Sequence, residues 1–248
     1  MAKSAARIVA IVQARMGSTR LPGKVLMELG GSTVLSRVLA RLRRSRWIDQ
    51  IVVATTSSGL DHVIDLECQR IGVSCFRGSE DDVLDRFYQT AQKYHAEAVV
   101  RITADCPLTD PELVDDVIRV FQNQHADYAT NTVLRTYPRG LDVEVFTYAA
   151  LSQAWQEASK RYEREHVTPY FYEHPTLFRM TSASGQTDYS RYRWTLDTDE
   201  DLRLIRAIYA RFRNEDDFSW LDVIAVMEKE PQLAELNGHV LQKSLHGG

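Results

Sequence analysis

Apolar runs and amphipathic segments alternate along the first half of the chain. Short apolar runs predict strands at about 7–13, 50–55, 73–76 and 97–103. Helical periodicity predicts helices between and after them, at about 33–45, 60–71, 81–95 and 110–124. The first of these helices carries one apolar face, made of Val34, Leu35, Val38, Leu39 and Leu42. Strands that alternate with helices predict a parallel sheet covered by helices.

The rhythm changes after residue 125. Further strands are expected at about 127–130, 141–147, 177–183 and 191–196, and helices near 148–160, 163–172, 199–213 and 219–229. We expect these strands to extend the sheet and an insertion among them to shape a pocket. Because no linker, repeat or low-complexity segment interrupts the chain, one domain is expected over 1–230. Residues 231–248 are polar enough to form a frayed tail or an oligomer arm.

Composition narrows the class of protein. A chain of 248 residues with 44% hydrophobic content can bury a full core, and a net charge of -4 gives no general case for a nucleic acid or an anionic membrane as partner. Apolar runs are too short for a membrane span or a signal-peptide core, so a cytoplasmic location is expected. Cys68, Cys75 and Cys106 are odd in number and lack CxxC spacing, which predicts reduced thiols and neither disulfides nor a zinc site.

Positive charge is concentrated in the loop that follows the first strand. Within 14–24, two glycines allow backbone N–H groups to approach a ligand, and Ser18 and Thr19 add hydroxyl donors. The cations are Arg15, Arg20 and Lys24. Such a loop suits the roughly four negative charges of a nucleoside triphosphate, although its spacing differs from the Walker P-loop. On composition alone, an ordinary solvated turn explains the loop equally well.

Strand order predicts where this loop lies. In a doubly wound sheet, ligands bind beyond the carboxyl ends of the parallel strands. The loops 14–24, 55–59, 77–81 and 103–107 should therefore share one rim.

Two aspartates on or near that rim are candidate metal ligands. Asp105 follows an apolar run, and a carboxylate at a strand end can bind Mg²⁺ together with phosphate oxygens and water. It could instead cap the turn before Pro107. In the acidic stretch 196–202, Thr198 or Asp199 is expected to cap a helix, whereas Asp197 precedes the cap and could be a second ligand of the same metal.

These segments together resemble a known family. The string Gln13-Ala14-Arg15-Met16-Gly17-Ser18-Thr19-Arg20-Leu21-Pro22-Gly23-Lys24, with 104–108 and 196–202, is similar to the cytidylyltransferases. That family includes the CMP-Kdo and CMP-acylneuraminate synthetases, and the resemblance is strongest to its spore-coat polysaccharide SpsF-type branch. It implies a three-layer α/β/α nucleotidyltransferase fold, Rossmann-like and similar to glycosyltransferase-A, with a mainly parallel central sheet. Residues 7–125 would form the nucleotide-binding half and 126–230 the acceptor-binding half.

The resemblance also implies roles for single residues. Arg15, Lys24, Asp105 and Asp197 would be catalytic, the two aspartates by binding Mg²⁺. With the rim loops, it predicts a nucleotide site of Gln13, Ala14, Arg15, Met16, Gly17, Ser18, Arg20, Lys24, Thr55, Gly78, Arg86 and Asp105. The acceptor would contact Arg139, Gly140, Asp142, Glu144, Glu165 and His166. The sequence around Arg86 differs from that of the Kdo enzymes, and Asp199 replaces a proline that is frequent in the family.

Several of these residues have an alternative interpretation. Glu165 and His166 could lie on the surface or at the edge of the core, and the face that carries Asp142 and Glu144 could be solvent or pocket floor. A nucleophilic role for Cys106 is disfavoured, because the adjacent carboxylate would raise the pKa of its thiol.

The implied reaction is nucleotidyl transfer. A hydroxyl of a small sugar, acidic or of the nonulosonic type, would attack the α-phosphorus of CTP in line and release pyrophosphate, for polysaccharide or glycan synthesis. A homodimer is compatible with this activity. The alternatives are a guanylyl or other-base transferase, a glycosyltransferase that uses a nucleotide-sugar donor, and a non-catalytic nucleotide-binding protein of the same fold.

Overall fold

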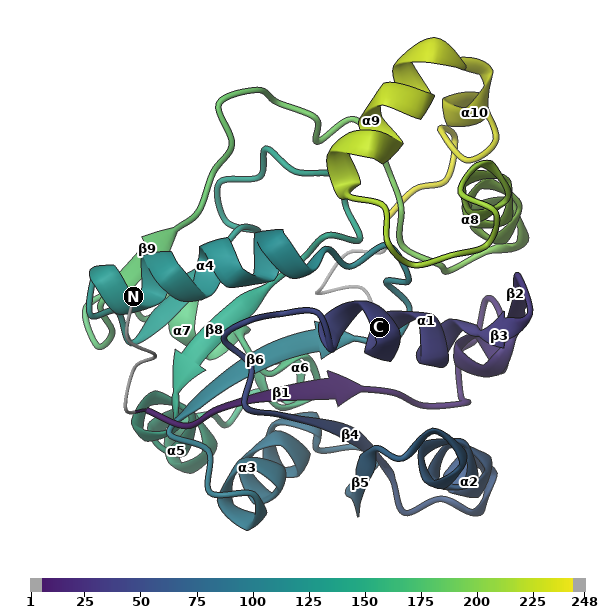
Figure 1. The fold of residues 1–248 in the computed structure, drawn as a ribbon. Helices are drawn as coiled ribbons and strands as arrows, with labels where there is room; N and C mark the ends of the chain where they lie inside the picture. The colour runs from purple at the N-terminus through teal and green to yellow at the C-terminus, as the bar shows by residue number, and fades with distance from the viewer. Residues whose placement is uncertain (1–5, 243–248) are drawn as a thin grey trace.

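The computed structural model describes residues 6–242, and a seven-stranded sheet forms its centre (Figure 1). The strand order is β5-β4-β1-β6-β8-β7-β9. Their bounds are β1 Ile8–Gln13, β4 Gln50–Thr56, β5 Ser74–Gly78, β6 Ala98–Thr103, β7 Tyr128–Thr130, β8 Glu144–Thr147 and β9 Met180–Ser182. Strand β8 runs antiparallel to both of its neighbours, and every other adjacent pair in this sheet is parallel. The predicted α/β class with a mainly parallel sheet is confirmed.

Helices cover both faces of the sheet because successive strand side chains point to opposite sides. Ala10 and Val12 of β1 pack into one apolar cluster, and Val9 and Ile11 pack into another. The first cluster includes side chains of α1 (Val34–Leu42), α2 (His62–Ile71) and α4 (Pro111–Asn123). The second includes side chains of α3 (Val83–Lys93), α5 (Tyr148–Glu157) and α7 (Pro169–Glu173). Figure 1 shows α1 and α4 on one side of β1 and β6, and α3 and α5 on the other.

A third apolar cluster lies beside the loops that follow β1 and β6. Trp194 is its largest fully buried side chain, and Leu21 and Leu108 join it from those loops. The helices that complete it are α8 (Asp199–Arg211), α9 (Trp220–Lys229) and α10 (Gln232–Glu235), which form a separate group in Figure 1. A two-stranded sheet of β2 (Glu28–Leu29) and β3 (Ser32–Thr33) precedes α1.

Two predicted elements are wrong. The helix expected at 163–172 is two short helices, α6 (Arg161–His166) and α7, because Val167 between them adopts a positive φ of 72°. The strand expected at 191–196 is an extended segment with one isolated bridge, between Arg139 and Arg193. Its backbone bonds are taken by loops: Trp194 N donates to Arg139 O (2.6 Å) and Leu196 N to Asp105 O (2.8 Å). No neighbouring strand is therefore needed.

The described part of the predicted tail packs onto the protein and is not frayed. Leu233 and Asn237 are buried, and Asn237 Nδ2 donates to Arg193 O and to Asp201 Oδ1, both at 2.8 Å. Residues 243–248 of that prediction lie outside the described residues. Within 6–242, the structure contains no helix long and apolar enough to cross a membrane.

Candidate active site

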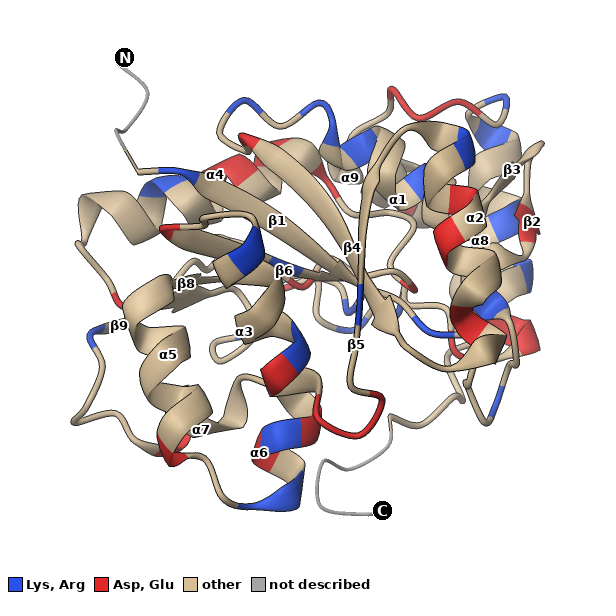
Figure 2. Cartoon of the chain, turned by 90° about the horizontal axis from the view of Figure 1, so that it is seen from below, with Lys and Arg blue, Asp and Glu red and all other residues tan. Residues whose placement is uncertain are grey.

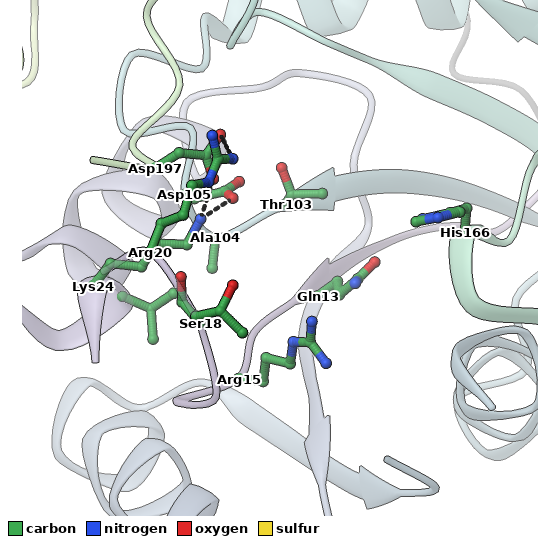
Figure 3. A pocket seen from close by; sticks show the side chains of 12 residues that line it. Gln13, Arg15, Ser18, Arg20, Lys24, Thr103, Ala104, Asp105, His166 and Asp197 are labelled. Atoms are coloured by element: carbon green, nitrogen blue, oxygen red, sulfur yellow. Dashed lines mark hydrogen bonds and ion pairs between the residues drawn. The ribbon is translucent and has the colours of Figure 1, made fainter. Parts of the chain in front are cut away.

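A cavity of about 290 Å³ lies at the carboxyl ends of β1 and β6 (Figure 3). Gln13 and Thr103, the last residues of those two strands, form part of its lining. The lining residues are Gln13, Arg15, Ser18, Thr19, Arg20, Lys24, Val25, Thr103, Ala104, Asp105, His166 and Asp197. Two of the four predicted rim loops therefore meet at one cavity.

The loop after β1 is held in shape by the loop after β4. Met16 N donates to Asp61 Oδ1 (2.7 Å), and Thr56 Oγ1 donates to the other oxygen of the same buried carboxylate (2.5 Å). Gly23 closes the turn by donating from N to Met16 O (3.0 Å) with a positive φ of 72°. A side chain there would be strained, because positive φ is disfavoured for residues with a Cβ. Lys24 then begins a short 3₁₀ helix, η1 (Lys24–Leu26), which directs its side chain into the cavity.

At one end of the cavity, Lys24 lies between the two predicted metal ligands. Its Nζ is 2.6 Å from Asp105 Oδ2 and 2.8 Å from Asp197 Oδ1. Dashed lines in Figure 3 mark the ion pairs at this end of the cavity. Asp197 Oδ2 also contacts Arg20 (3.0 Å) and Arg193 (2.7 Å). Two carboxylates from loops distant in the sequence therefore contact the same ammonium group, that of Lys24.

The same contacts set the protonation of this cluster. Burial alone would lower the pKa of Lys24, but Asp105 and Asp197 outweigh burial and raise that pKa above its ordinary value. Burial would raise the pKa of Asp197, and Lys24 with Arg20 and Arg193 reverses that effect and lowers it. Lys24 and Asp197 are consequently both charged near neutral pH.

The opposite end of the cavity carries Arg15 and His166 (Figure 3). The exposed Arg15 also lines a neighbouring cavity of about 620 Å³, whose other lining residues are Glu80, Asp81, Asp82, Arg161, Arg164 and Glu165. Figure 2 shows the acidic loop after β5 facing α6 there. Arg164 Nε donates to Asp82 Oδ2 (2.9 Å) and so fixes α6 to the start of α3. Ligands in the two cavities would share Arg15.

Half of the predicted nucleotide-site residues do not line the main cavity. These are Ala14, Met16, Gly17, Thr55, Gly78 and Arg86. Thr55 is fully buried, and a Cβ on Gly78 would lie 2.9 Å from the Phe76 ring and 3.1 Å from Arg86 Cγ. Gly78 is therefore needed because a larger residue there would collide with the side chains of Phe76 and Arg86.

Arg86 is fully buried next to this glycine. Its Nη1 donates to Ser79 O, whereas Nε and Nη2 have no hydrogen-bond partner among residues 6–242. Burial and the nearby charge of Arg15 lower the pKa of the Arg86 guanidinium to about 10. Arg86 thus keeps two donor nitrogens without a partner among the described residues, near the charge of Arg15.

The predicted acceptor residues are more dispersed than the sequence suggested. His166 lines the main cavity, Glu165 the neighbouring one, and Arg139 a third of about 140 Å³. Glu144 is buried, pairs with Arg101 and accepts a hydrogen bond from Tyr128 Oη (2.6 Å). Its carboxylate is therefore occupied by internal partners.

Two further acceptor candidates have contacts that the sequence did not predict. Asp142 forms a two-oxygen ion pair with Arg135, at 2.6 and 3.0 Å. Gly140 has a φ of 106°, and a Cβ there would lie 2.5 Å from the carbonyl carbon of Trp194. This glycine is required where two backbone segments cross, which is a structural requirement.

Sequence reasoning missed Arg193 and Asp61, both of which shape the site. Arg193 is a charged residue inside the apolar run 192–196, and that pattern is a usable signal because buried arginines are nearly always paired. Asp61 carries no such signal.

Cys106 behaves as predicted: burial and Asp105 raise the pKa of its thiol.

Comparison with known proteins decides the family. The model of a protein family described as cytidylyltransferase matches residues 9–244. The chain belongs to this cytidylyltransferase family. It is a member of an enzyme family, and the predicted nucleotidyltransferase class is confirmed.

Similar proteins support the assignment. The spore coat polysaccharide biosynthesis protein SpsF of Bacillus subtilis is 36% identical over 92% of this chain and 96% of that protein. A cytidylyltransferase structure from Leptospira borgpetersenii superposes with a TM-score of 0.90 at 34% identity, covering 96% of this chain and 99% of that one. CMP:2-keto-3-deoxy-manno-octonic acid synthetase, solved with CTP, shares the fold at a TM-score of 0.62 and 17% identity, over 83% of this chain and 99% of that one.

Proposed function

We propose that this cytidylyltransferase couples CTP to a small acidic sugar, giving a CMP-sugar and pyrophosphate for polysaccharide synthesis. The observation that carries the proposal is the convergence of Asp105 and Asp197 on one cationic position, at the end of a cavity lined by the cations of the loop 14–24. The name of the similar Bacillus protein supports the polysaccharide context, and the structure of similar fold with CTP supports the nucleotide.

The donor set suits Mg²⁺. This ion prefers oxygen ligands and is commonly held by one or two carboxylates, with substrate phosphates and water completing its shell. Asp105 and Asp197 supply two such carboxylates. The described part of the chain contains no group of three or more His, Cys, Asp or Glu side chains that could hold a metal, so substrate phosphates and water would have to provide the remaining ligands. When bound, Mg²⁺ would neutralise phosphate charge and act as a Lewis acid.

The protein's own side chains would mainly position the substrates and stabilise charge. Arg15, Arg20 and Lys24 provide cations for the triphosphate, and Ser18 adds a hydroxyl donor. The sugar hydroxyl would approach the α-phosphorus opposite the leaving pyrophosphate, with His166 at the acceptor end of the cavity. No covalent protein intermediate is needed, in agreement with the buried, protonated thiol of Cys106.

Pyrophosphate release tests this function. Purified protein with Mg²⁺ is incubated with CTP, GTP, UTP or ATP, and with acidic sugars or sugar 1-phosphates. We expect release with CTP and an acidic sugar, and a loss of about 100-fold or more in Asp105→Asn and Asp197→Asn, the order observed when one charge-stabilising group is removed. Asp116→Asn, an exposed aspartate paired with Arg119 on α4, is the matched control and should retain activity.

Other outcomes would overturn parts of the proposal. Release with GTP and none with CTP would contradict cytidine as the base. Release with sugar 1-phosphates alone would contradict the acidic acceptor. Transfer from a finished nucleotide-sugar without pyrophosphate release would favour the glycosyltransferase alternative.

A further inference from the structure

The position that suits a metal is held by an internal cation. Lys24 Nζ lies 2.6 Å from Asp105 Oδ2 and 2.8 Å from Asp197 Oδ1. Its side chain is 10% exposed, and those of the two aspartates are 23% and 13% exposed. Mg²⁺ requires its oxygen ligands at about 2.0–2.1 Å. A metal bound to both of these oxygens would therefore occupy the space that Nζ now fills, so the two exclude each other.

Charge opposes metal entry as well as space. Asp105 and Asp197 together carry two negative charges, and three cations, Lys24, Arg20 and Arg193, lie within 3.0 Å of their oxygens. The cluster is neutralised internally before any metal arrives. Adding a divalent cation while Lys24 remains would place like charges next to one another in a partly buried site, which is strongly unfavourable.

We infer that Lys24 closes the metal position in the nucleotide-free protein and that the metal enters only together with the nucleotide. This inference rests on the proposed function and concerns the regulation of the same site. A triphosphate would offer Lys24 and Arg20 new anionic partners, and the departure of Lys24 would free Asp105 Oδ2 and Asp197 Oδ1 to bind the metal while Arg193 still holds Asp197 Oδ2. The phosphates would also complete the metal's shell, which two carboxylates alone leave unfilled.

The local backbone allows Lys24 to change partners without refolding the loop. Lys24 N donates to Leu21 O (3.3 Å), Met27 N donates to Lys24 O (3.2 Å), and the turn at Gly23 is closed by Met16 O. These bonds hold the main chain, whereas the four-carbon stem of lysine has several rotatable bonds and a compact charged end. The exchange therefore requires only rotation of one side chain.

The experiment measures Mn²⁺ binding, by the electron paramagnetic resonance signal of the free ion. The wild-type protein should bind Mn²⁺ weakly by itself and at least tenfold more tightly with saturating CTP, once the Mn²⁺ that CTP binds in a protein-free sample has been subtracted. Lys24→Met should bind Mn²⁺ at least tenfold more tightly than the wild type in the absence of CTP. The double variant Lys24→Met/Asp105→Asn should lose that gain, and Lys93→Met, which removes a remote lysine on α3, should behave as wild type.

The outcomes distinguish a failure of the inference about Lys24 from a failure of the proposed nucleotidyl transfer. Tight Mn²⁺ binding by the wild type without nucleotide overturns the inference, and this arm needs no variant to fold. A folded Lys24→Met protein with unchanged Mn²⁺ affinity also overturns it, while CTP-dependent binding by the wild type leaves the proposed function intact. Absence of Mn²⁺ binding in every arm, with or without CTP, overturns both.

Discussion

At the scale of single residues, the buried cations differ in how completely their donors are used. Arg193 reaches Asp197, Asp201 and Gln242 through its guanidinium nitrogens. Arg86 is more completely buried than Arg193, yet two of its donor nitrogens lack partners among the described residues. An unsatisfied buried donor costs about 1–3 kcal/mol, so these two nitrogens are expected to weaken the fold unless a ligand bonds them. The sequence predicts that Arg86 contacts the nucleotide, which would be such a ligand.

We therefore expect Arg86→Met to separate stability from binding. Methionine fills much of the same volume without unsatisfied donors, so the free energy of unfolding should rise by about 1 kcal/mol. If the predicted nucleotide contact exists, CTP affinity should fall about tenfold or more, because methionine cannot make charge-assisted hydrogen bonds to the ligand. Urea denaturation and isothermal titration calorimetry with CTP measure the two effects. Lower stability with unchanged CTP affinity would show that Arg86 is a structural residue.

At the scale of elements, one carboxylate joins the start of α1 to α2. Thr33 caps α1 by accepting from Ser36 N (3.0 Å), and its Oγ1 donates to Glu67 Oε1 on α2 (2.7 Å). Ser36 Oγ (2.9 Å) and Arg70 Nη2 (2.8 Å) donate to the same oxygen. Arg70 first, with Thr33 and Ser36, lowers the pKa of Glu67 to about 2. This link fixes the helix that follows the loop of the site.

Glu67→Gln should lower stability in a pH-dependent way. A carboxyl whose folded pKa is depressed stabilises the protein fully above its unfolded pKa of 4.5, and that stabilisation is lost as pH falls from 4.5 towards 2. Since Arg70 is 61% exposed, solvent screening limits the effect to about 1 kcal/mol at pH 7. Urea denaturation of both proteins at pH 7, 5 and 3.5 should show the difference shrinking only below pH 4.5. An equal difference at every pH would contradict this account, and the exposed Glu235→Gln is the control.

At the scale of the whole molecule, the C-terminal segment supports the site without lining the main cavity. Asp201 is fully buried at the start of α8 and accepts hydrogen bonds from Asp197 N (2.9 Å) and Arg193 Nε (3.0 Å). Asn237 Nδ2 donates to Asp201 Oδ1, the oxygen that also accepts from Arg193 Nε, and to Arg193 O, which connects the segment after α10 to Asp197. The position of a candidate metal ligand therefore depends on residues 40 positions beyond it.

Asn237→Asp should reveal this long-range support. The change replaces a donor by a second carboxylate 2.8 Å from that of Asp201, so the free energy of unfolding should fall by about 1–3 kcal/mol. Pyrophosphate release should fall as well, because Asp201 and Arg193 position Asp197. Chemical denaturation and the release assay check both, with the exposed Gln232→Glu on α10 as control. Unchanged stability would mean that this hydrogen bond contributes nothing to folding.

The sequence by itself determined the parts of this protein that depend on local pattern. Strands and helices can be told apart in the sequence, because side chains repeat every 2 residues along a strand and every 3.6 along a helix. Their regular alternation in the first half of the chain predicted the parallel strands. The dense run of glycines, hydroxyls and cations at 14–24 identified the family, which the comparisons confirm. The order of strands and helices also predicted that the loops of Lys24 and Asp105 share one rim, and both residues line one cavity.

Only the tertiary structure decided which charged groups meet. Lys24 contacts carboxylates 81 and 173 residues away, and no local spacing encodes those distances along the chain. Glu144 was predicted to contact an acceptor, and its partners Arg101 and Tyr128 become visible only when β6, β7 and β8 pair in register. Hydrophobic periodicity directs a side chain to a face of the sheet, but the partner it finds there depends on how the elements pack.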